Sequence, residues 1–224
     1  SAKNRSRKII AELMILYNTL MAEFCKSRSI PVIFRSQPTP ELNSRTEGLQ
    51  DGPYLWFMQM QGLPPAEFST IPGSHHSLGV EHYSQVSAPL RRYTDLITQR
   101  QIGHYLHSGQ LLYSVEEIAS VGQRGSIQLR EIAGIEDSVK RYWFLKFLTK
   151  RISESENQKN SDIFYAVALE KSDRRGALLE LSEYPFRFRA TLPNTANPGD
   201  VALVKLQGID LWHRSTQFTY LSKG

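Results

Sequence analysis

The hydrophobic pattern of this 224-residue chain changes its period at a polar stretch, Ser153 to Ser161. Before this stretch, apolar residues recur at three- and four-residue steps, which is typical of amphipathic helices. After it, five short apolar runs alternate with turns rich in Gly, Pro, Asn and Asp, which predicts a small closed β-barrel. We therefore predict an α+β fold, with a mainly helical part over 1–152, a linker over 153–161 and a five-stranded barrel over 162–224.

The sequence of the first part, 1–152, predicts several helices and one short strand. The strand covers 30–34 and carries Arg35 at its end, whereas 54–60 could be strand or helix, and 62–79 reads as a long irregular loop. Ser114 and Glu117 have the spacing of a capping box, which marks a helix start. Cys25 falls in a helical apolar pattern, which favours a buried structural thiol. The expected helices cover 8–27, 93–106, 114–123 and 127–151.

Composition narrows the possible partners. The net charge of +5 favours a polyanionic partner, and 19 basic against 15 acidic residues precede residue 161, compared with 8 against 7 after it. No apolar run is long enough to span a membrane. The single cysteine excludes an internal disulfide and a multi-Cys zinc site, and it suits a cytoplasmic or other reducing intracellular compartment. Nothing in the sequence indicates a heme or nucleotide cofactor.

The segment from Tyr83 to Leu96, YSQVSAPLRRYTDL, carries the clearest signal for chemistry. An extended arm is broken by a proline, and Arg91 and Arg92 then fall at the start of a helix, where backbone N–H groups already favour anions. Arginine adds bidentate contacts suited to phosphate, and Arg100 could point to the same region. The alternative is a pair of surface arginines bonded to carboxylates. We expect Asp95 to cap the helix or pair with an arginine.

Three ordered segments resemble the ribonuclease II/R (RNB) family. APLRRYTDL at 88–96 resembles its SP(I/L)RRYxDL signature, although Ala88 replaces the serine and Gln99 replaces a usual histidine. PGSHHSLGVEHY at 72–83 resembles a lead-in of some bacterial members, and AELM with IPVIFR resembles a stretch further upstream. The resemblance covers roughly 6–150, and the barrel resembles the S1-like OB-fold barrel that closes many members.

The resemblance implies a processive 3′→5′ exoribonuclease that uses magnesium to hydrolyse single-stranded RNA to nucleoside 5′-monophosphates. Arg91 would contact the scissile phosphate. Other residues would contact RNA, with a helix-surface salt bridge as the alternative for Glu136 and core packing as the alternative for the barrel aromatics. These candidate RNA contacts are Arg35, Arg92, Tyr93, Arg100, Glu136, Phe186 and Phe188, and further candidate base stackers are Phe164, Tyr165, Trp212, Phe218 and Tyr220.

The family's metal-binding aspartate cluster is not found, because the aspartates of this sequence are isolated from one another. Two-metal chemistry needs several converging carboxylates. We therefore predict that the Mg²⁺ ligands lie outside this chain, in the N-terminal portion of the same enzyme. The alternative is a catalytically inactive RNA-binding scaffold of the same fold. His75, His76 and His82 fit loop packing or RNA contact better than a transition-metal site.

Overall fold

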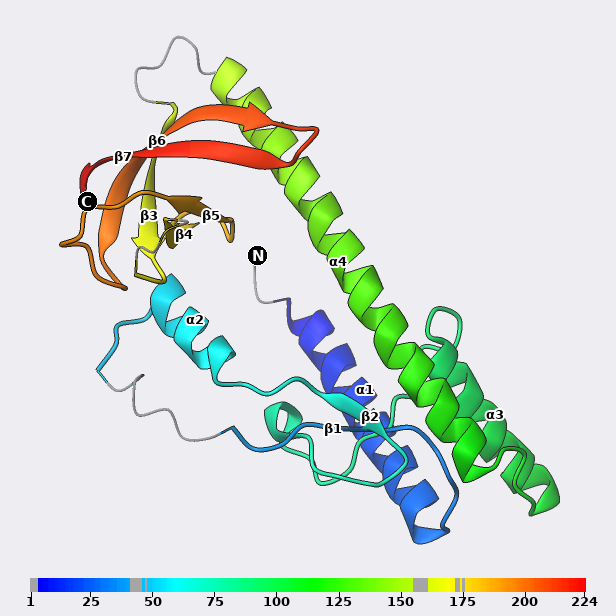
Figure 1. Cartoon of the computed structure of the whole chain (residues 1–224). Coiled ribbons are helices and arrows are strands. Elements are labelled where there is room, and N and C mark those ends of the chain that lie inside the picture. Colours follow the sequence, from blue (N-terminus) through cyan, green and yellow to red (C-terminus); the bar gives the residue numbers. More distant parts are fainter. Residues whose placement is uncertain (1–3, 41–45, 47, 155–160, 172–173, 175) are drawn as a thin grey trace. The chain divides into compact units, whose positions relative to one another are not determined.

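The computed structural model describes residues 4–40, 46, 48–154, 161–171, 174 and 176–224 (Figure 1). The chain forms two compact units, a helical unit of Ser1–Leu42 with Leu63–Ile132 and a barrel unit of Asn43–Gly62 with Ala133–Gly224. The elements, in chain order, are α1 (Arg5–Ser27), β1 (Phe34–Ser36), α2 (Pro53–Gln61), β2 (Glu67–Ser69), the 3₁₀ helix η2 (His76–Leu78), α3 (Tyr93–Ser108), α4 (Val115–Glu154), β3 (Ile163–Ala168), β4 (Ala177–Leu181), β5 (Arg187–Ala190), β6 (Val201–Asp210) and β7 (Ser215–Lys223).

The helical unit is built on α1, α3 and a two-stranded antiparallel sheet of β1 and β2. Neither strand matches the predicted positions. β1 begins only at the last residue of the strand predicted over 30–34, and β2 lies in the segment predicted as a loop. Cys25 is fully buried with its apolar neighbours, as predicted for a structural thiol. Burial raises the pKa of this thiol to about 12, so the group stays protonated at neutral pH.

Helix α4 corrects the prediction of two separate helices, because it runs without a break for 40 residues. Its start is the predicted capping box: the Ser114 N–H donates to Glu117 Oε2 at 2.8 Å, and the Glu117 N–H donates to Ser114 Oγ at 3.2 Å. Gly125 lies at the predicted break. A Cβ there would be 2.9 Å from Thr94 Cγ2, so this glycine allows close contact with α3 and does not end the helix.

The apolar stripe of α1, the residues whose three- and four-residue spacing predicts this helix, is not buried in this structure, except for Phe24 at the end of the series, which packs partly against the core. Asn18, Ala22 and Cys25 are the buried residues of the helix, because they face the core of the helical unit. The stripe itself lies on the opposite, open side, with each of these side chains more than half exposed: Ile9, Leu13, Leu16 and Leu20.

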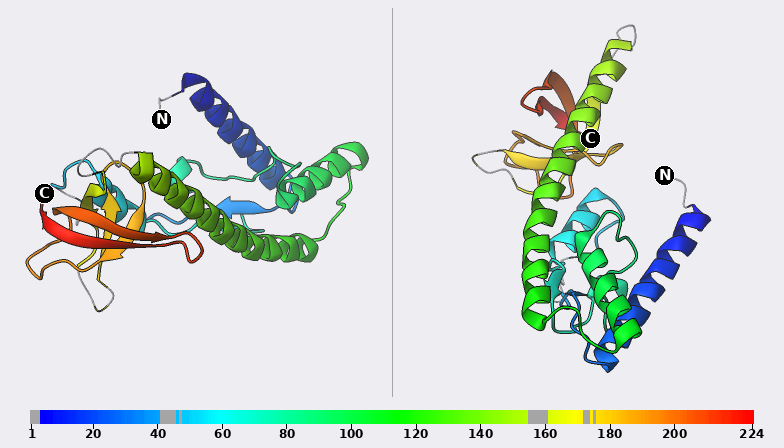
Figure 2. Two further views of the ribbon diagram at one scale, coloured as in Figure 1. Left: turned by 90° about the horizontal axis from the view of Figure 1, so that it is seen from above. Right: turned by 90° about the vertical axis from the view of Figure 1, so that its right-hand side faces the viewer.

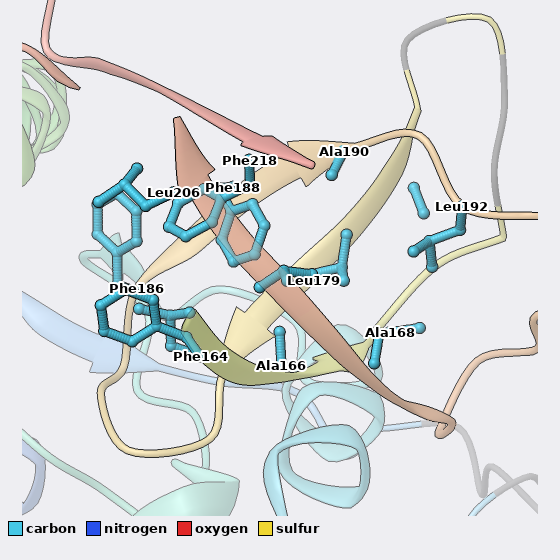
Figure 3. Close-up of a cluster of buried hydrophobic side chains, with 14 of the residues drawn as sticks. Phe164, Ala166, Ala168, Leu179, Phe186, Phe188, Ala190, Leu192, Leu206 and Phe218 are labelled. Atoms are coloured by element: carbon cyan, nitrogen blue, oxygen red, sulfur yellow. The ribbon is translucent and has the colours of Figure 1, made fainter. Parts of the chain in front are cut away.

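The barrel unit confirms the predicted five strands, in the order β5-β4-β3-β6-β7, with every neighbouring pair antiparallel. Strands β6 and β7 form the longest pair, visible in both views of Figure 2. Phe188 of β5 stacks on Phe218 of β7 with ring centroids 3.9 Å apart, so the two edge strands approach each other and nearly close the barrel. Figure 3 shows these rings pointing into a common apolar core with Phe164, Phe186 and Leu206.

The end of α4 belongs to the barrel unit. Leu145 and Leu148 are fully buried in the barrel core, and α2 lies against β3. Ser153 and Glu154, the first residues of the predicted linker, are the last residues of α4, whereas 155–160 lie outside the described residues. The predicted domain limits at 152 and 162 therefore stay a prediction. Within the described residues, no helix has both the length and the apolar character that crossing a membrane requires.

Candidate functional site

A hydrogen-bonded turn fixes the chain just before α3. The N–H groups of Arg91 and Arg92 both donate to the Ala88 carbonyl, at 3.2 and 3.0 Å. Arg92 is the N-cap residue of α3 in extended conformation, and its side chain does not cap the helix. The turn therefore places two consecutive arginines at the N-terminus of α3, the positive end of the helix dipole, as the sequence predicted.

The side chain of Arg92 is held by a buried carboxylate. Its Nη2 donates to Asp95 Oδ2 at 2.6 Å and to Ser87 Oγ at 3.3 Å. Asp95 is completely buried, and the same Oδ2 accepts from the Ala88 N–H at 2.9 Å. This confirms that Asp95 pairs with an arginine, and it shows that Arg92 stabilises the turn.

Arg91 has the opposite environment. Its side chain is exposed, and among residues 4–40, 46, 48–154, 161–171, 174 and 176–224 its guanidinium has no hydrogen-bond or ion-pair partner. The charge of Arg91 is therefore available to an anion, at a helix end that itself favours anions.

Buried polar contacts fix the extended arm that leads to this turn. Asn18 of α1 donates to Tyr83 Oη at 2.9 Å and accepts from the Val86 N–H at 3.0 Å. Gln99 of α3 donates to the Val86 carbonyl at 2.6 Å. The position of the two arginines is thus set by several elements of the helical unit. Nothing in the sequence pattern pointed to Asn18, because it lies on the face of α1 opposite the apolar stripe, where a polar residue is expected to be exposed.

Arg35 lies next to Arg92 through a residue that the sequence analysis did not single out. With the Gln85 amide oriented so that its oxygen faces the two guanidinium groups, this oxygen accepts from Arg35 Nη1 at 3.1 Å and from Arg92 Nη1 at 3.2 Å. Arg35 also lies over the Phe68 ring, 5.9 Å from its centroid. The structure therefore brings together three of the predicted residues, Arg35, Arg91 and Arg92, although Arg91 joins the group through the backbone alone.

Tyr93 and Arg100 lie further along α3. Tyr93 is 60% exposed and lines a cavity of about 430 Å³ between α3 and the first turns of α4. Tyr113 lines the same cavity, and the Arg100 guanidinium lies 5.8 Å from the centre of its ring. Both predicted residues are thus accessible on the helix that begins at the arginine turn.

Glu136 lies in the barrel unit, on an exposed part of α4. Its carboxylate is 3.5 Å from Lys140 Nζ, one turn along the same helix. The helix-surface ion pair, which the sequence left open as the alternative, is the arrangement that the structure shows.

Phe186 and Phe188 require a correction. They are 5% and 4% exposed, because their side of β5 and of the turn before it faces the barrel core, so neither presents a free ring face to a base. The core-packing alternative is the observed one. Among the other candidates, Phe164 and Phe218 are also buried and Tyr220 is partly buried, whereas Tyr165 is 56% and Trp212 87% exposed.

The histidines of the long loop have structural environments. His75 is buried edge-on against Tyr83, and burial together with the nearby charge of Arg35 lowers its pKa. His82 contacts Lys26 through Nε2 and lies 3.7 Å from Glu23 Oε1. Loop packing therefore accounts for both His75 and His82.

The carboxylates of the described residues do not fit a magnesium centre. Asp95, the acid beside the arginine turn, is committed to Arg92. In the described part of the chain, one group has the spacing to hold an ion, Glu23 with Glu81 and His82, and the ammonium of Lys26 lies against its histidine nitrogen. Magnesium prefers oxygen ligands, and a neighbouring cation opposes its binding.

The sequence and fold of the chain resemble those of known proteins. Residues 1–108 match the model of the RNB domain. Over 213 residues, the chain is 35% identical to an uncharacterized ribonuclease, sll1290, of Synechocystis, covering 92% of this chain and 30% of the relative. The fold resembles a Dss1 exoribonuclease active-site mutant from Candida glabrata, with a TM-score of 0.83 and 19% identity, over 99% of this chain and 29% of that chain.

A second structural neighbour is the Mycoplasma genitalium RNase R in complex with ribose-methylated single-stranded RNA. The TM-score is 0.79 at 18% identity, over 99% of this chain and 42% of that chain. The helical unit and the barrel thus define the C-terminal portion of an RNB-type protein. The chain is therefore similar to the ribonuclease II/R family, with the RNB match confined to residues 1–108, and it spans less than a third of the length of its Synechocystis relative.

Proposed function

We propose that this chain is part of a 3′→5′ exoribonuclease that hydrolyses single-stranded RNA processively to nucleoside 5′-monophosphates. The observation that carries the proposal is the exposed guanidinium of Arg91, which has no partner within the described residues and lies next in sequence to the Arg92–Asp95 pair. The turn fixes the backbone of Arg91, and a guanidinium that contacts the scissile phosphate would stabilise charge that rearranges as the bond breaks, which is the main protein contribution to phosphoryl transfer. Arg91 is the residue that we assign to the scissile phosphate.

Neighbouring groups would hold the rest of the strand. Arg35 and Arg100 supply positive charge on the helical unit, and Arg92 adds guanidinium donors although Asp95 balances its charge. Tyr93 offers an exposed ring on the same helix as Arg100. Among the candidate base stackers named from the sequence, Tyr165 and Trp212 have rings exposed enough to stack on bases. The barrel would therefore add affinity and residence time and would take no part in the chemistry.

Metal chemistry would come from the remaining portion of the enzyme. Magnesium would neutralise charge at the scissile phosphate, and its ligands would lie outside this chain, because the acids described above do not form a suitable site. The exposed apolar stripe of α1 offers that portion a surface on which to pack.

The test uses a 5′-labelled oligo(A) RNA, the intact enzyme and magnesium. We expect progressive shortening from the 3′ end, release of nucleoside 5′-monophosphates, and no accumulation of intermediates when excess unlabelled RNA traps released enzyme. The 224-residue chain alone should bind RNA without shortening it. Binding by the intact protein without any cleavage would instead support the inactive scaffold, and magnesium-dependent cleavage by the 224 residues would show that they contain the metal site.

A further inference from the structure

Gln85 occupies an unusual position between two cations. It lies on the extended arm before the arginine turn, and its amide oxygen accepts from Arg35 on β1 and from Arg92 at the start of α3. These two arginines come from parts of the chain more than fifty residues apart. Like charges repel, so two guanidinium groups that share one acceptor need that acceptor to keep them side by side.

The side chain that accepts both hydrogen bonds, Gln85, is an amide and carries no charge. Arg92 already has a full counter-charge in Asp95, whereas Arg35 has no ion-pair partner within the described residues. A glutamate at position 85 would make stronger, charge-assisted hydrogen bonds to both arginines. It would also cancel the positive charge of Arg35. Fold stability alone would therefore favour a carboxylate, whereas binding of an anion favours the amide.

We propose that Gln85 is a positioning residue that holds Arg35 beside Arg92 without neutralising it, so that Arg35 can bind a backbone phosphate of the RNA strand. The inference rests on the proposed function, since it names one contact within the same RNA-binding site. Gln85 itself need not touch the RNA. Its effect is to fix the direction of the Arg35 guanidinium, whose planar fork suits a phosphate.

The decisive variant is Gln85→Glu in the intact protein. We expect its thermal midpoint to equal or exceed that of the wild type, while its affinity for single-stranded oligo(A) falls several-fold to about tenfold. Each phosphate contact contributes about 0.7 to the slope of log affinity against log salt for single strands, so the slope should fall by roughly that amount. Fluorescence anisotropy at four or five salt concentrations measures both quantities.

Gln110→Glu is the matched control. It adds the same charge just beyond the other end of α3, about 24 Å of helix away from Arg92, and should leave the slope unchanged. Gln85→Met keeps the side-chain length but removes the acceptor, and it should lower both the thermal midpoint and the RNA affinity.

The outcomes separate the two levels of inference. Two results would contradict the role proposed for Gln85 and leave the proposed function standing. One is that Gln85→Glu binds RNA as tightly as the wild type with an unchanged salt dependence, and the other is that Gln85→Met binds RNA normally. If the wild-type protein itself does not bind single-stranded RNA, the proposed function fails and this inference fails with it.

Discussion

Arg92 and Asp95 form an ion pair at 2.6 Å in which the carboxylate is completely buried, while the adjacent Arg91 stays exposed. Of the two consecutive arginines, Arg92 therefore stabilises the turn, whereas the side chain of Arg91 is exposed to solvent. The backbone explains this difference: Arg92 is the N-cap residue of α3, three residues before the first-turn acid Asp95, whereas Arg91 belongs to the turn that precedes the helix.

The first prediction concerns this ion pair. Asp95→Asn should destabilise the protein by about 3–5 kcal/mol, because removing one partner of a buried pair leaves the other charge uncompensated. The matched control is Glu136→Gln, which breaks the exposed pair with Lys140 and should cost less than about 1 kcal/mol. Urea unfolding of both variants measures the difference. Equal losses for the two would show that the Arg92–Asp95 pair does not stabilise the turn.

The second prediction concerns Arg91 in the intact enzyme. Arg91→Ala should lower the single-turnover cleavage rate by about 10²–10³-fold, because it removes a donor that acts in the transition state. The affinity for RNA should change little, since many other phosphate contacts remain. Arg91→Lys should rescue poorly, because an ammonium cannot reproduce a planar bidentate fork.

Arg92→Ala is the internal control for Arg91. It should lower the thermal midpoint, because Asp95 loses its partner, whereas Arg91→Ala should leave the midpoint unchanged. If Arg91→Ala reduces affinity and rate by the same factor, or if Arg92→Ala slows cleavage more in a folded protein, Arg91 is not the residue at the scissile phosphate.

The third prediction separates exposed from buried aromatic residues in the barrel. Trp212→Ala should weaken RNA binding by about 5- to 150-fold, the equivalent of about 1–3 kcal/mol for one stacked base, without changing the thermal midpoint. Phe188→Ala should instead destabilise the barrel by about 3–5 kcal/mol, because it leaves a cavity beside Phe218. Anisotropy and thermal unfolding measure the two effects, and unchanged RNA affinity of Trp212→Ala would exclude this residue as a base contact.

The fourth prediction concerns pH. The folded pKa of His75 is lowered, so the unfolded chain takes up a proton on this side chain before the folded protein does. The contribution of neutral His75 is therefore fully present above about pH 6.5 and is lost as the pH falls toward the folded pKa. His75→Phe keeps a ring against Tyr83 but does not titrate, so its stability should fall less between about pH 7.5 and 5.5.

Comparing urea midpoints of wild type and His75→Phe at both pH values isolates this effect. The pKa values of Asp200 and Asp210 are lowered by hydrogen bonds, so both carboxylates stay charged across this pH range and do not add to the difference. An identical loss in the two proteins would mean that His75 titrates normally in the fold.

Periodicity predicted the elements of this fold well where the local signal agreed with the tertiary structure. The capping box at Ser114 marked the true start of α4, and the turn residues of the barrel separated five strands correctly. The break predicted between residues 123 and 127 was wrong, because the helix continues through this segment. Gly125 allows a close contact with Thr94 of α3, which is distant in sequence, so no local pattern could reveal it.

The candidate site was predictable to a similar extent. The two arginines at a helix start and the acid three residues later pointed to an anion site and an ion pair. Which arginine takes the acid was not predictable, because it depends on the path of the turn. Strand alternation at Phe186 and Phe188 likewise showed that the rings share one face but not whether that face is the core. Gln85 carried no signal, since its partners come from separate segments.

The five strands of the barrel do not form an independent folding unit. Leu145 and Leu148 from α4 fill its core, and Arg141 donates to the carbonyls of Arg187 and Arg214 while lying over Phe186. A gene fusion that joins another protein to residue 161 would transplant the strands without these side chains and would expose the apolar interior. A transferable module has to start near residue 133 and also carry α2, so the independent unit is larger than the five strands alone.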